Sequence, residues 1–211
     1  MSVDVAVVDY GLGNIRSVRR GLERADATVT VVDDPVAMRA ADGIVLPGVG
    51  AFREGVENAG PFRDAIRDAA ADGQPIFGIC LGMQMLLSSS EEADHEGQGD
   101  ANGLSLIPGR NVRFSGEHKV PHMGWNQLRT VRDHPVFGGI DGEYAYFVHS
   151  YYAEPDDDAA IVATTDYGTS FPAIIATEAG NVFGTQFHPE KSGTVGLGIL
   201  ENFVSYCAGR S

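Results

Sequence analysis

Short apolar runs alternate with stretches of helical spacing in the first half of the chain. Residues 3–9 form a β-branched apolar run, and the stretch 14–25 places Ile15, Val18 and Leu22 on one helical face. The alternation continues to residue 87, with strands expected at 28–32, 43–46 and 75–79 and helices beginning at 35 and covering 61–71 and 81–87. Strands that alternate with helices predict an α/β fold with a mainly parallel open sheet and helices on both faces.

The second half of the chain is richer in strands. Strand-like runs follow one another at 111–114, 125–131, 144–149, 161–165, 172–177 and 181–187. With few helical stretches between them, antiparallel additions to the sheet are expected. Residues 193–208 have the apolar spacing of a closing helix, whereas 88–102 is polar and is expected to be a mobile loop. Neither an internal repeat nor a linker interrupts the pattern, so residues 1–211 are expected to form a single domain.

Three glycine-containing loops follow apolar runs, at 10–14, 47–51 and 78–82. Functional sites of parallel sheets lie at the carboxyl ends of the strands, so all three loops are expected at the same edge. The first loop is not a dinucleotide-binding fingerprint, because its third glycine position is occupied by Arg16.

A candidate nucleophile, Cys80, lies in Gly78-Ile79-Cys80-Leu81-Gly82 between a predicted strand and a predicted helix. This G-x-C-x-G pattern is the cysteine version of a nucleophile elbow, in which a sharp turn lifts the side chain clear of the sheet. The N–H groups and dipole of the following helix favour a thiolate and a developing oxyanion, and the Leu81 N–H is the natural first donor. A cysteine packed in a turn for structural reasons is the alternative.

A candidate base and its orienting carboxylate lie near the C-terminus, in Gln186-Phe187-His188-Pro189-Glu190. Residues two apart in an extended segment point to the same side, so Glu190 can hold one ring nitrogen of His188 while the other faces Cys80. A surface loop with a solvated glutamate would explain this segment alone. The elbow and the His-Pro-Glu segment together favour a Cys-His-Glu triad.

The remaining histidines carry weaker signals. His118 and His122 are four residues apart, but a proline between them argues against a helix, and no third ligand has metal spacing. No metal site is therefore expected. His149 lies in an apolar run and is expected to be a hydrogen-bonded core histidine, whereas His95 and His134 are expected at the surface.

The charge balance excludes some partners. The chain has 29 acidic and 15 basic residues, a formal net charge of −14, and two of its basic residues are lysines, Lys119 and Lys191. Such a field repels nucleic acid and anionic lipid, so neither a nucleic-acid partner nor a membrane partner is expected. An ordinary acidic protein and adaptation to high salt both fit these numbers, and the scarcity of lysine favours the second.

The lack of a recognisable secretory signal or membrane helix and the low cysteine content predict a cytoplasmic protein. The N-terminal residues read as a strand rather than a secretory signal, and no apolar run approaches the roughly 18 residues of a membrane helix. With only Cys80 and Cys207, a disulfide framework is not expected.

The order of these motifs resembles the class I, triad-type glutamine amidotransferases, whose flavodoxin-like α/β fold is thereby expected. Cys80 in its elbow followed by His188-Pro189-Glu190 is the signature of that family. Other segments are similar to its glutaminase subunits that supply a separate cyclase, and they extend the likeness over nearly the whole chain. These are Asp9–Asn14, Pro47–Phe52, Gly78–Gln84, Pro121–Asn126, Tyr146–Tyr151 and Gly184–Ser192.

The resemblance implies a role for each matching position. Cys80 would attack the side-chain amide of glutamine, His188 would transfer protons and Glu190 would orient His188. The other implied positions fall into three groups: an oxyanion hole at Gly48, Val49, Gly50 and Leu81, a glutamine-binding set at Gln84, Glu92, Ser150 and Tyr151, and a partner-facing set at Asn14, Trp125, Asn126, Tyr146 and Lys191.

The resemblance also implies a partner, and no cofactor. The family's cyclase is a TIM barrel of about 250 residues, which this chain has no room for, so a heterodimer is expected. Three alternatives remain: an amidotransferase subunit serving anthranilate or pyridoxal phosphate synthesis, a free-standing thiol hydrolase acting on γ-glutamyl peptides, and a non-catalytic binding module. Co-purification with a cyclase, turnover without a partner and an incomplete triad would distinguish them.

Overall fold

A computed structural model describes residues 2–92, 101–116 and 118–209 of the chain. Within these residues the main sheet has eight strands in the order β2-β1-β3-β4-β13-β12-β11-β8. The five strands from β2 to β13 are parallel, and β12, β11 and β8 add antiparallel to their edge. The strands are β1 (Val3–Val8), β2 (Ala27–Val32), β3 (Gly43–Gly48), β4 (Ile76–Cys80), β8 (Arg129–Thr130), β11 (Ile161–Asp166), β12 (Ser170–Ala176) and β13 (Val182–Thr185).

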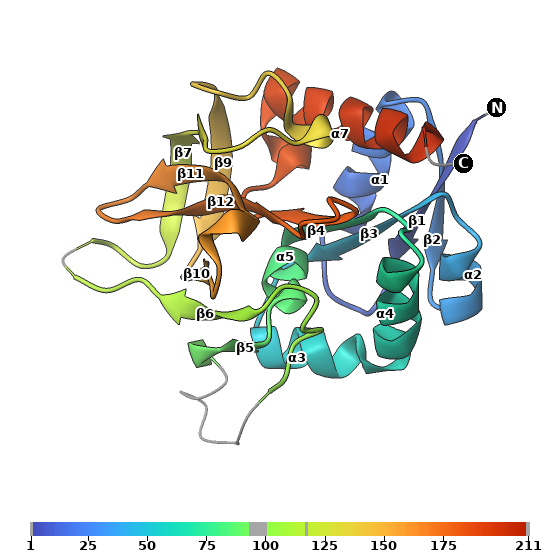
Figure 1. The fold of residues 1–211 in the computed structure, drawn as a ribbon, viewed down its shortest axis with the longest axis horizontal. Coiled ribbons are helices and arrows are strands. Elements are labelled where there is room, and N and C mark those ends of the chain that lie inside the picture. The colour runs from blue at the N-terminus through green and yellow to red at the C-terminus, as the bar shows by residue number, and fades with distance from the viewer. Residues whose placement is uncertain (1, 93–100, 117, 210–211) are drawn as a thin grey trace.

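Helices cover both faces of this sheet (Figure 1). On one face, α1 (Ile15–Arg24) and α7 (Gly193–Ala208) bury their apolar residues against β1, β4 and β13. On the other face lie α2 (Pro35–Arg39), α3 (Phe52–Asn58), α4 (Arg63–Ala71) and α5 (Leu81–Leu86). This arrangement confirms the predicted fold class. Short 3₁₀ helices occur at η1 (Gly60–Phe62), η2 (Pro135–Phe137), η3 (Asp158–Ala160) and η4 (Pro189–Lys191).

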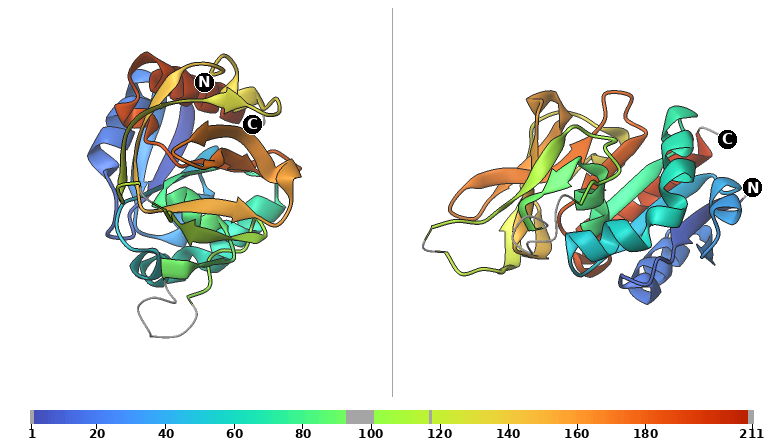
Figure 2. Two further views of the ribbon diagram at one scale, coloured as in Figure 1. Left: turned by 90° about the vertical axis from the view of Figure 1, so that its left-hand side faces the viewer. Right: turned by 90° about the horizontal axis from the view of Figure 1, so that it is seen from below.

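Two smaller sheets extend from the antiparallel side of the molecule (Figure 2). One joins β10 (Tyr151–Pro155), β6 (Gly109–Arg113) and β5 (Ser89–Ser90). The other is an antiparallel pair of β7 (His122–Gln127) and β9 (Tyr144–His149). Both sheets run past the carboxyl ends of β3 and β4, so they enclose the edge where the glycine loops lie.

Some elements differ from the sequence-based expectation. The run at 125–131 is divided between β7 and β8, which belong to different sheets, and β10 was not expected because it alternates weakly. Helix α3 was also missed, because its seven residues are too few to show a helical period. Of the loop expected at 88–102, residues 89–90 form β5 and 93–100 lie outside the described residues, as does His95. Among the described helices, none is both long enough and apolar enough to cross a membrane.

Candidate active site

The turn from β4 into α5 holds Cys80 in a sharp elbow. Cys80 has φ +54°, a left-handed conformation that a non-glycine residue adopts only at a cost. The flanking glycines make the turn possible, because a Cβ on Gly82 would lie 1.8 Å from the Leu46 carbonyl oxygen and one on Gly78 would lie 2.7 Å from the Gly82 carbonyl. The first turn of α5 therefore packs against β3 and β4 directly behind the thiol.

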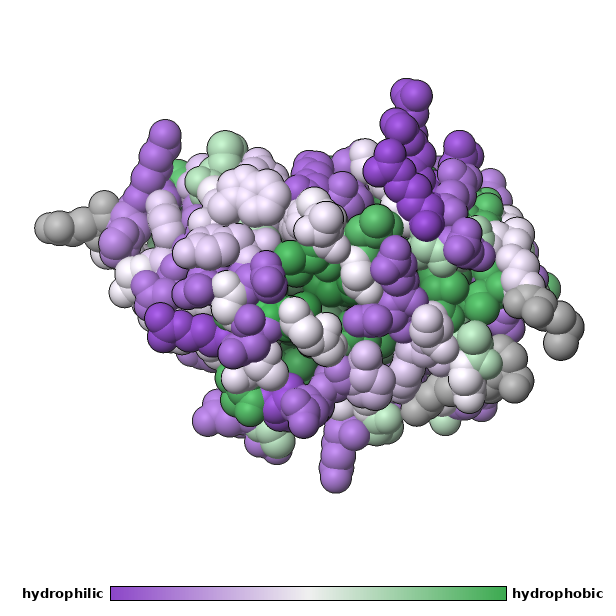
Figure 3. All heavy atoms as spheres, turned by 90° about the horizontal axis from the view of Figure 1, so that it is seen from above, coloured by the Kyte–Doolittle hydropathy of each residue, from purple (hydrophilic) through white to green (hydrophobic). Residues whose placement is uncertain are grey.

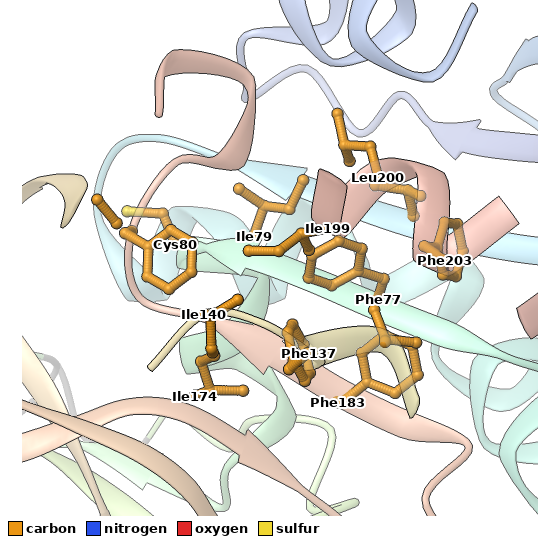
Figure 4. Close-up of a cluster of buried hydrophobic side chains, with 14 of the residues drawn as sticks. Phe77, Ile79, Cys80, Phe137, Ile140, Ile174, Phe183, Ile199, Leu200 and Phe203 are labelled. Atoms are coloured by element: carbon orange, nitrogen blue, oxygen red, sulfur yellow. The ribbon is translucent and has the colours of Figure 1, made fainter. Parts of the chain in front are cut away.

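Apolar packing supports this elbow from one side. In Figure 4, Cys80 continues the row of Phe77 and Ile79 along β4. The Phe77 ring packs at centroid distances of 5.4 Å from both Phe183 and Phe203. A strand held this firmly gives Cys80 a fixed position, which a nucleophile at a strained turn requires.

A cavity of about 390 Å³ opens beside the thiol. Cys80 is only 7% exposed, so the cavity is its route to solvent. The lining comes from the loop after β3, the elbow, the two smaller sheets, the segments beside them and the His-Pro-Glu segment: Val49, Gly50, Cys80, Leu81, Gln84, Glu92, Pro121, Val148, His149, Ser150, Tyr151 and His188.

His188 and Glu190 form a buried pair at this cavity. The His188 Nδ1 lies 2.9 Å from Glu190 Oε1, and the two side chains are 2% and 1% exposed. The Nε2 of His188 is buried and has no hydrogen bond of normal geometry among the described residues, which leaves it for the thiol. Burial alone would lower the pKa of His188, but the interactions with Cys80 and Glu190 outweigh burial and raise it to about 9.

The backbone around His188 is braced by β9. The His188 N–H donates to the Tyr146 carbonyl at 3.0 Å, and the Ser192 hydroxyl donates to the His188 carbonyl at 2.7 Å. Ser192 also accepts from the Tyr146 N–H at 3.0 Å. The histidine is therefore fixed to the same strand that carries Tyr146 and His149.

The loop expected to contribute the oxyanion hole begins where β3 ends. Gly48 pairs with Cys80 in the sheet register, and a Cβ there would lie 2.6 Å from the Tyr10 hydroxyl and 2.7 Å from Leu81 Cβ. Gly50 has φ +116°, and Val49 and Gly50 line the cavity. The buried Tyr10 hydroxyl donates a hydrogen bond to the Pro47 carbonyl and so anchors the start of the loop.

The four residues expected to bind glutamine all line the cavity. The Gln84 side-chain N–H donates to the Tyr151 carbonyl at 2.9 Å. Ser150 and Tyr151 lie at the turn from β9 into β10. Glu92 accepts a hydrogen bond from the Phe52 N–H at 2.8 Å, which places this carboxylate opposite the elbow.

Three of the expected partner-facing residues contact one another. Trp125 and Tyr146 are in ring contact at 5.9 Å, and the Lys191 ammonium lies 5.9 Å from the Tyr146 ring centroid. The Asn126 side chain is instead hydrogen bonded to His122 and to the Asp166 carbonyl. Asn14 lies at the start of α1, where its carbonyl accepts from the Ser17 and Val18 N–H groups.

The sequence did not predict one residue beside the thiol, and the exposure predicted for one histidine is wrong. The missed residue is the buried Gln186, whose side-chain N–H points to Cys80 Sγ at 3.8 Å. Its side-chain carbonyl accepts a hydrogen bond from the Gln84 side chain at 3.2 Å. The sequence signal for Gln186 was its position two residues before His188. The surface prediction for His134 is wrong: it is 6% exposed and bonded to the Gly180 carbonyl, because its ring packs on Phe183. The core prediction for His149 is confirmed.

Sequence comparison identifies the class. Residues 6–206 match the family model described as glutamine amidotransferase class-I, and the chain belongs to that family. A solved structure of PurLQS from Thermotoga maritima has the same fold, with a TM-score of 0.75 and 22% identity over 98% of this chain and 99% of that one. The glutaminase domain of Trypanosoma brucei CTPS aligns with a TM-score of 0.70 and 18% identity over 99% and 94% of the two chains.

Curated relatives narrow the class to one kind of subunit. The protein named imidazole glycerol phosphate synthase subunit HisH is 75% identical in Halobacterium salinarum, over 97% of this chain and 94% of the relative. The protein of the same name from Haloarcula marismortui is 65% identical, over 98% of this chain and 96% of the relative. The one from Methanosarcina acetivorans is 50% identical, over 96% of this chain and 98% of the relative. The chain is thus an enzyme subunit of the HisH group of glutamine amidotransferases, and its acidity fits its halophilic relatives.

Proposed function

We propose that the chain hydrolyses glutamine to glutamate and ammonia through Cys80, His188 and Glu190. The observation that carries this proposal is the arrangement of a thiol, an imidazole and a carboxylate around one cavity. The thiol stands on a strained elbow, and the imidazole is held 2.9 Å from a buried carboxylate with its other nitrogen left for the thiol. A nucleophile, a base and an orienting group are the parts that covalent acyl transfer requires.

In the first half of the reaction, the Cys80 thiolate attacks the side-chain carbonyl carbon of glutamine. The oxyanion that forms is stabilised by the Leu81 N–H and by an N–H of the Gly48–Gly50 loop. His188 carries the thiol proton and donates it to the leaving nitrogen, so ammonia departs and a γ-glutamyl thioester remains. In the second half, His188 removes a proton from water, hydroxide displaces the thiolate and glutamate is released.

Glutamine would lie between the elbow and the β9–β10 turn. The Glu92 carboxylate lines this cavity and is suited to the substrate ammonium, and the cavity wall formed by Gln84, Ser150 and Tyr151 would hold the rest of the amino acid. A cavity of about 390 Å³ is large enough for one glutamine molecule.

The ammonia would pass to a separate cyclase subunit. The relatives are named as subunits of imidazole glycerol phosphate synthase, so we propose a heterodimer with a TIM-barrel cyclase that forms imidazole glycerol phosphate and aminoimidazole carboxamide ribotide in histidine biosynthesis. Residues 1–211 would act as one domain in the cytoplasm, which suits two buried cysteines that form no disulfide. The partner-facing set would be Asn14, Trp125, Asn126, Tyr146 and Lys191.

The test is substitution of the nucleophile in the reconstituted complex. Cys80→Ser is expected to lower glutamine-dependent synthesis by roughly 10⁶-fold, as loss of a nucleophile does in triad proteases. Synthesis from added ammonium salt is expected to survive, because the cyclase is unchanged. Cys207→Ser, at a buried cysteine on α7, is the matched control and is expected to keep glutaminase activity. Glutamine hydrolysis by Cys80→Ser at the wild-type rate would overturn the assignment.

A further inference from the structure

A chain of hydrogen bonds runs from β7 to the wall of the glutamine cavity. The Asn126 side-chain N–H donates to the Asp166 carbonyl at 2.6 Å, and Asn126 Oδ1 lies 2.8 Å from His122 Nε2. His122 Nδ1 then lies 3.2 Å from His149 Nε2, and His149 Nδ1 lies 2.8 Å from the Tyr151 carbonyl. Both ends of the histidine pair therefore face oxygen atoms that only accept hydrogen bonds.

When both rings are neutral, this chain of hydrogen bonds has one N–H hydrogen too few. Three contacts, Asn126–His122, His122–His149 and His149–Tyr151, each need one N–H. Two neutral imidazoles provide two. Turning the Asn126 amide over does not help, because its oxygen would then face the Asp166 carbonyl at 2.6 Å. One of the three contacts must therefore lack a bridging hydrogen, and the tautomers of the two rings determine which contact that is.

The surroundings keep the rings neutral. His122 and His149 are 1% and 6% exposed, and their neighbours are rings: His122 lies 4.0 Å from the Tyr167 ring, and His149 lies 5.3 Å from that of Phe171. Burial lowers the pKa of His149 to about 3, with further lowering from His122 and from His188 nearby. Burial also lowers the pKa of His122. A third proton that would complete the chain is therefore absent at neutral pH.

The two ends of the chain touch different parts of the proposed machinery. Asn126 is half-buried on β7, directly after the exposed Trp125. The Tyr151 carbonyl at the other end also accepts from Gln84, whose side chain bonds to Gln186 beside the Cys80 sulfur. A change of tautomer thus alters a hydrogen bond in the cavity wall without moving a strand.

We propose that His122 and His149 are positioning residues, a tautomeric relay in which the hydrogen bond from His122 to Asn126 Oδ1 competes with the hydrogen bond from His149 to the Tyr151 carbonyl. When Asn126 Oδ1 accepts a hydrogen bond from His122 Nε2–H, either the contact between the two rings or the contact to the Tyr151 carbonyl lacks a hydrogen. When that oxygen is removed, as in Asn126→Ala, both rings carry their proton on Nδ1 and His149 donates to the Tyr151 carbonyl. The inference rests on the proposed function, since it assigns Tyr151 to the glutamine site.

The first test reads the tautomers and does not depend on activity. Long-range ¹H–¹⁵N spectra of the histidine-labelled full chain at pH 7.5, assigned with His122→Gln and His149→Asn, distinguish Nδ1–H, Nε2–H and charged rings. Wild type is expected to show two neutral rings with Nε2–H populated on His122. Asn126→Ala is expected to convert both rings to Nδ1–H. His134 serves as internal control, because its bonds to the Gly180 carbonyl and the Val136 N–H demand Nε2–H in both proteins.

Either of two results would overturn the relay: a charged ring in the pair at pH 7.5, which supplies a hydrogen to all three contacts, or a His122 tautomer that does not respond to Asn126→Ala.

The second test uses glutamine kinetics of the complex. His149→Phe is expected to raise the glutamine KM about threefold to tenfold, the worth of one hydrogen bond, with a smaller change in kcat. His149→Asn, whose amide N–H can replace Nδ1–H, is expected to restore KM. Equal KM in both variants would contradict a positioning role, whereas wild-type protein without glutaminase activity would refute the proposed function and leave the spectroscopic result standing.

Discussion

At the scale of single residues, the pair of His188 and Glu190 decides how the proposed site responds to pH. Its two side chains are almost completely buried and joined by a 2.9 Å hydrogen bond. Although burial disfavours a charged imidazole, the interactions with Cys80 and Glu190 raise the His188 pKa to about 9, above the ordinary value of about 6.5. A pKa raised on folding means that the folded state binds the proton more tightly, so the stabilisation is complete below about pH 6.5 and is lost as pH rises through about 9.

The first prediction concerns this carboxylate. Glu190→Gln is expected to lower the His188 pKa, and each pKa unit lost removes up to about 1.4 kcal/mol of the free energy of unfolding at low pH. The difference between wild type and variant is therefore expected to be larger at pH 6 than at pH 9.5. Chemical denaturation at constant potassium chloride measures it, with Glu201→Gln on the exposed face of α7 as control. A difference that stays constant with pH would show that Glu190 does not set the His188 pKa.

At the scale of elements, the loop after β3 is the part best suited to switch the site. Tyr10 anchors its first carbonyl, and the two glycines that follow allow the peptides on either side of Val49 to rotate at low steric cost. A rotation of that kind turns an N–H toward or away from the oxyanion. One missing oxyanion donor costs about 10²–10³ in turnover. A partner favours the complete arrangement only as far as it binds that state more tightly.

The second prediction follows from this loop. The isolated subunit is expected to turn over glutamine about 10²–10³ times more slowly than the complex loaded with cyclase and nucleotide, mainly in kcat. Tyr146→Ala and Lys191→Ala are expected to weaken the rise more than they weaken glutamine binding. Tyr144→Ala is the matched control, because Tyr144 is an exposed tyrosine on the same strand. An isolated subunit as fast as the loaded complex would exclude the switch and favour a free-standing hydrolase.

At the scale of the whole molecule, the surface is dominated by acidic and other polar groups. The net charge is −14, and on the face formed by α1 and α7 hydrophilic side chains surround a limited apolar area (Figure 3). Among the described residues, close pairs with arginine neutralise four of the carboxylates: Arg19–Glu23, Arg39–Asp72, Arg53–Glu57 and Arg110–Glu154. Ion pairs at the surface contribute little in water. Repulsion among unpaired carboxylates therefore opposes folding at low ionic strength.

The third prediction is a dependence of stability on salt. Raising potassium chloride from about 0.1 M to about 1 M shortens the screening length from about 10 Å to about 3 Å, so the melting temperature is expected to rise. Thermal unfolding followed by circular dichroism measures the effect, and sucrose of equal osmolality controls for changes in water activity. A melting temperature that is flat or falls with potassium chloride would favour an ordinary acidic protein over one adapted to high salt.

The sequence alone determined the alternation of strands and helices, the parallel start of the sheet and the motifs of the proposed triad. These follow from local signals: apolar periodicity, and short segments such as 78–82 and 188–190 whose spacing has a direct stereochemical meaning. The closing helix was predicted with its observed bounds, because its apolar residues repeat over four turns against a single face. Sequence resemblance also pointed to Gln84, Glu92, Ser150 and Tyr151, all of which line the cavity beside Cys80.

Only the tertiary structure decided which distant side chains meet. The approach of Gln186 to Cys80, the burial of His134 and the Asn126–His122–His149–Tyr151 chain join residues on separate strands, and no periodicity encodes such meetings. The splitting of residues 122–130 between two sheets has the same origin, because strand pairing is settled by neighbours far along the chain. Local spacing thus specified the proposed reacting groups, whereas the hydrogen bonds that orient them depend on how the three sheets of the described residues pack together.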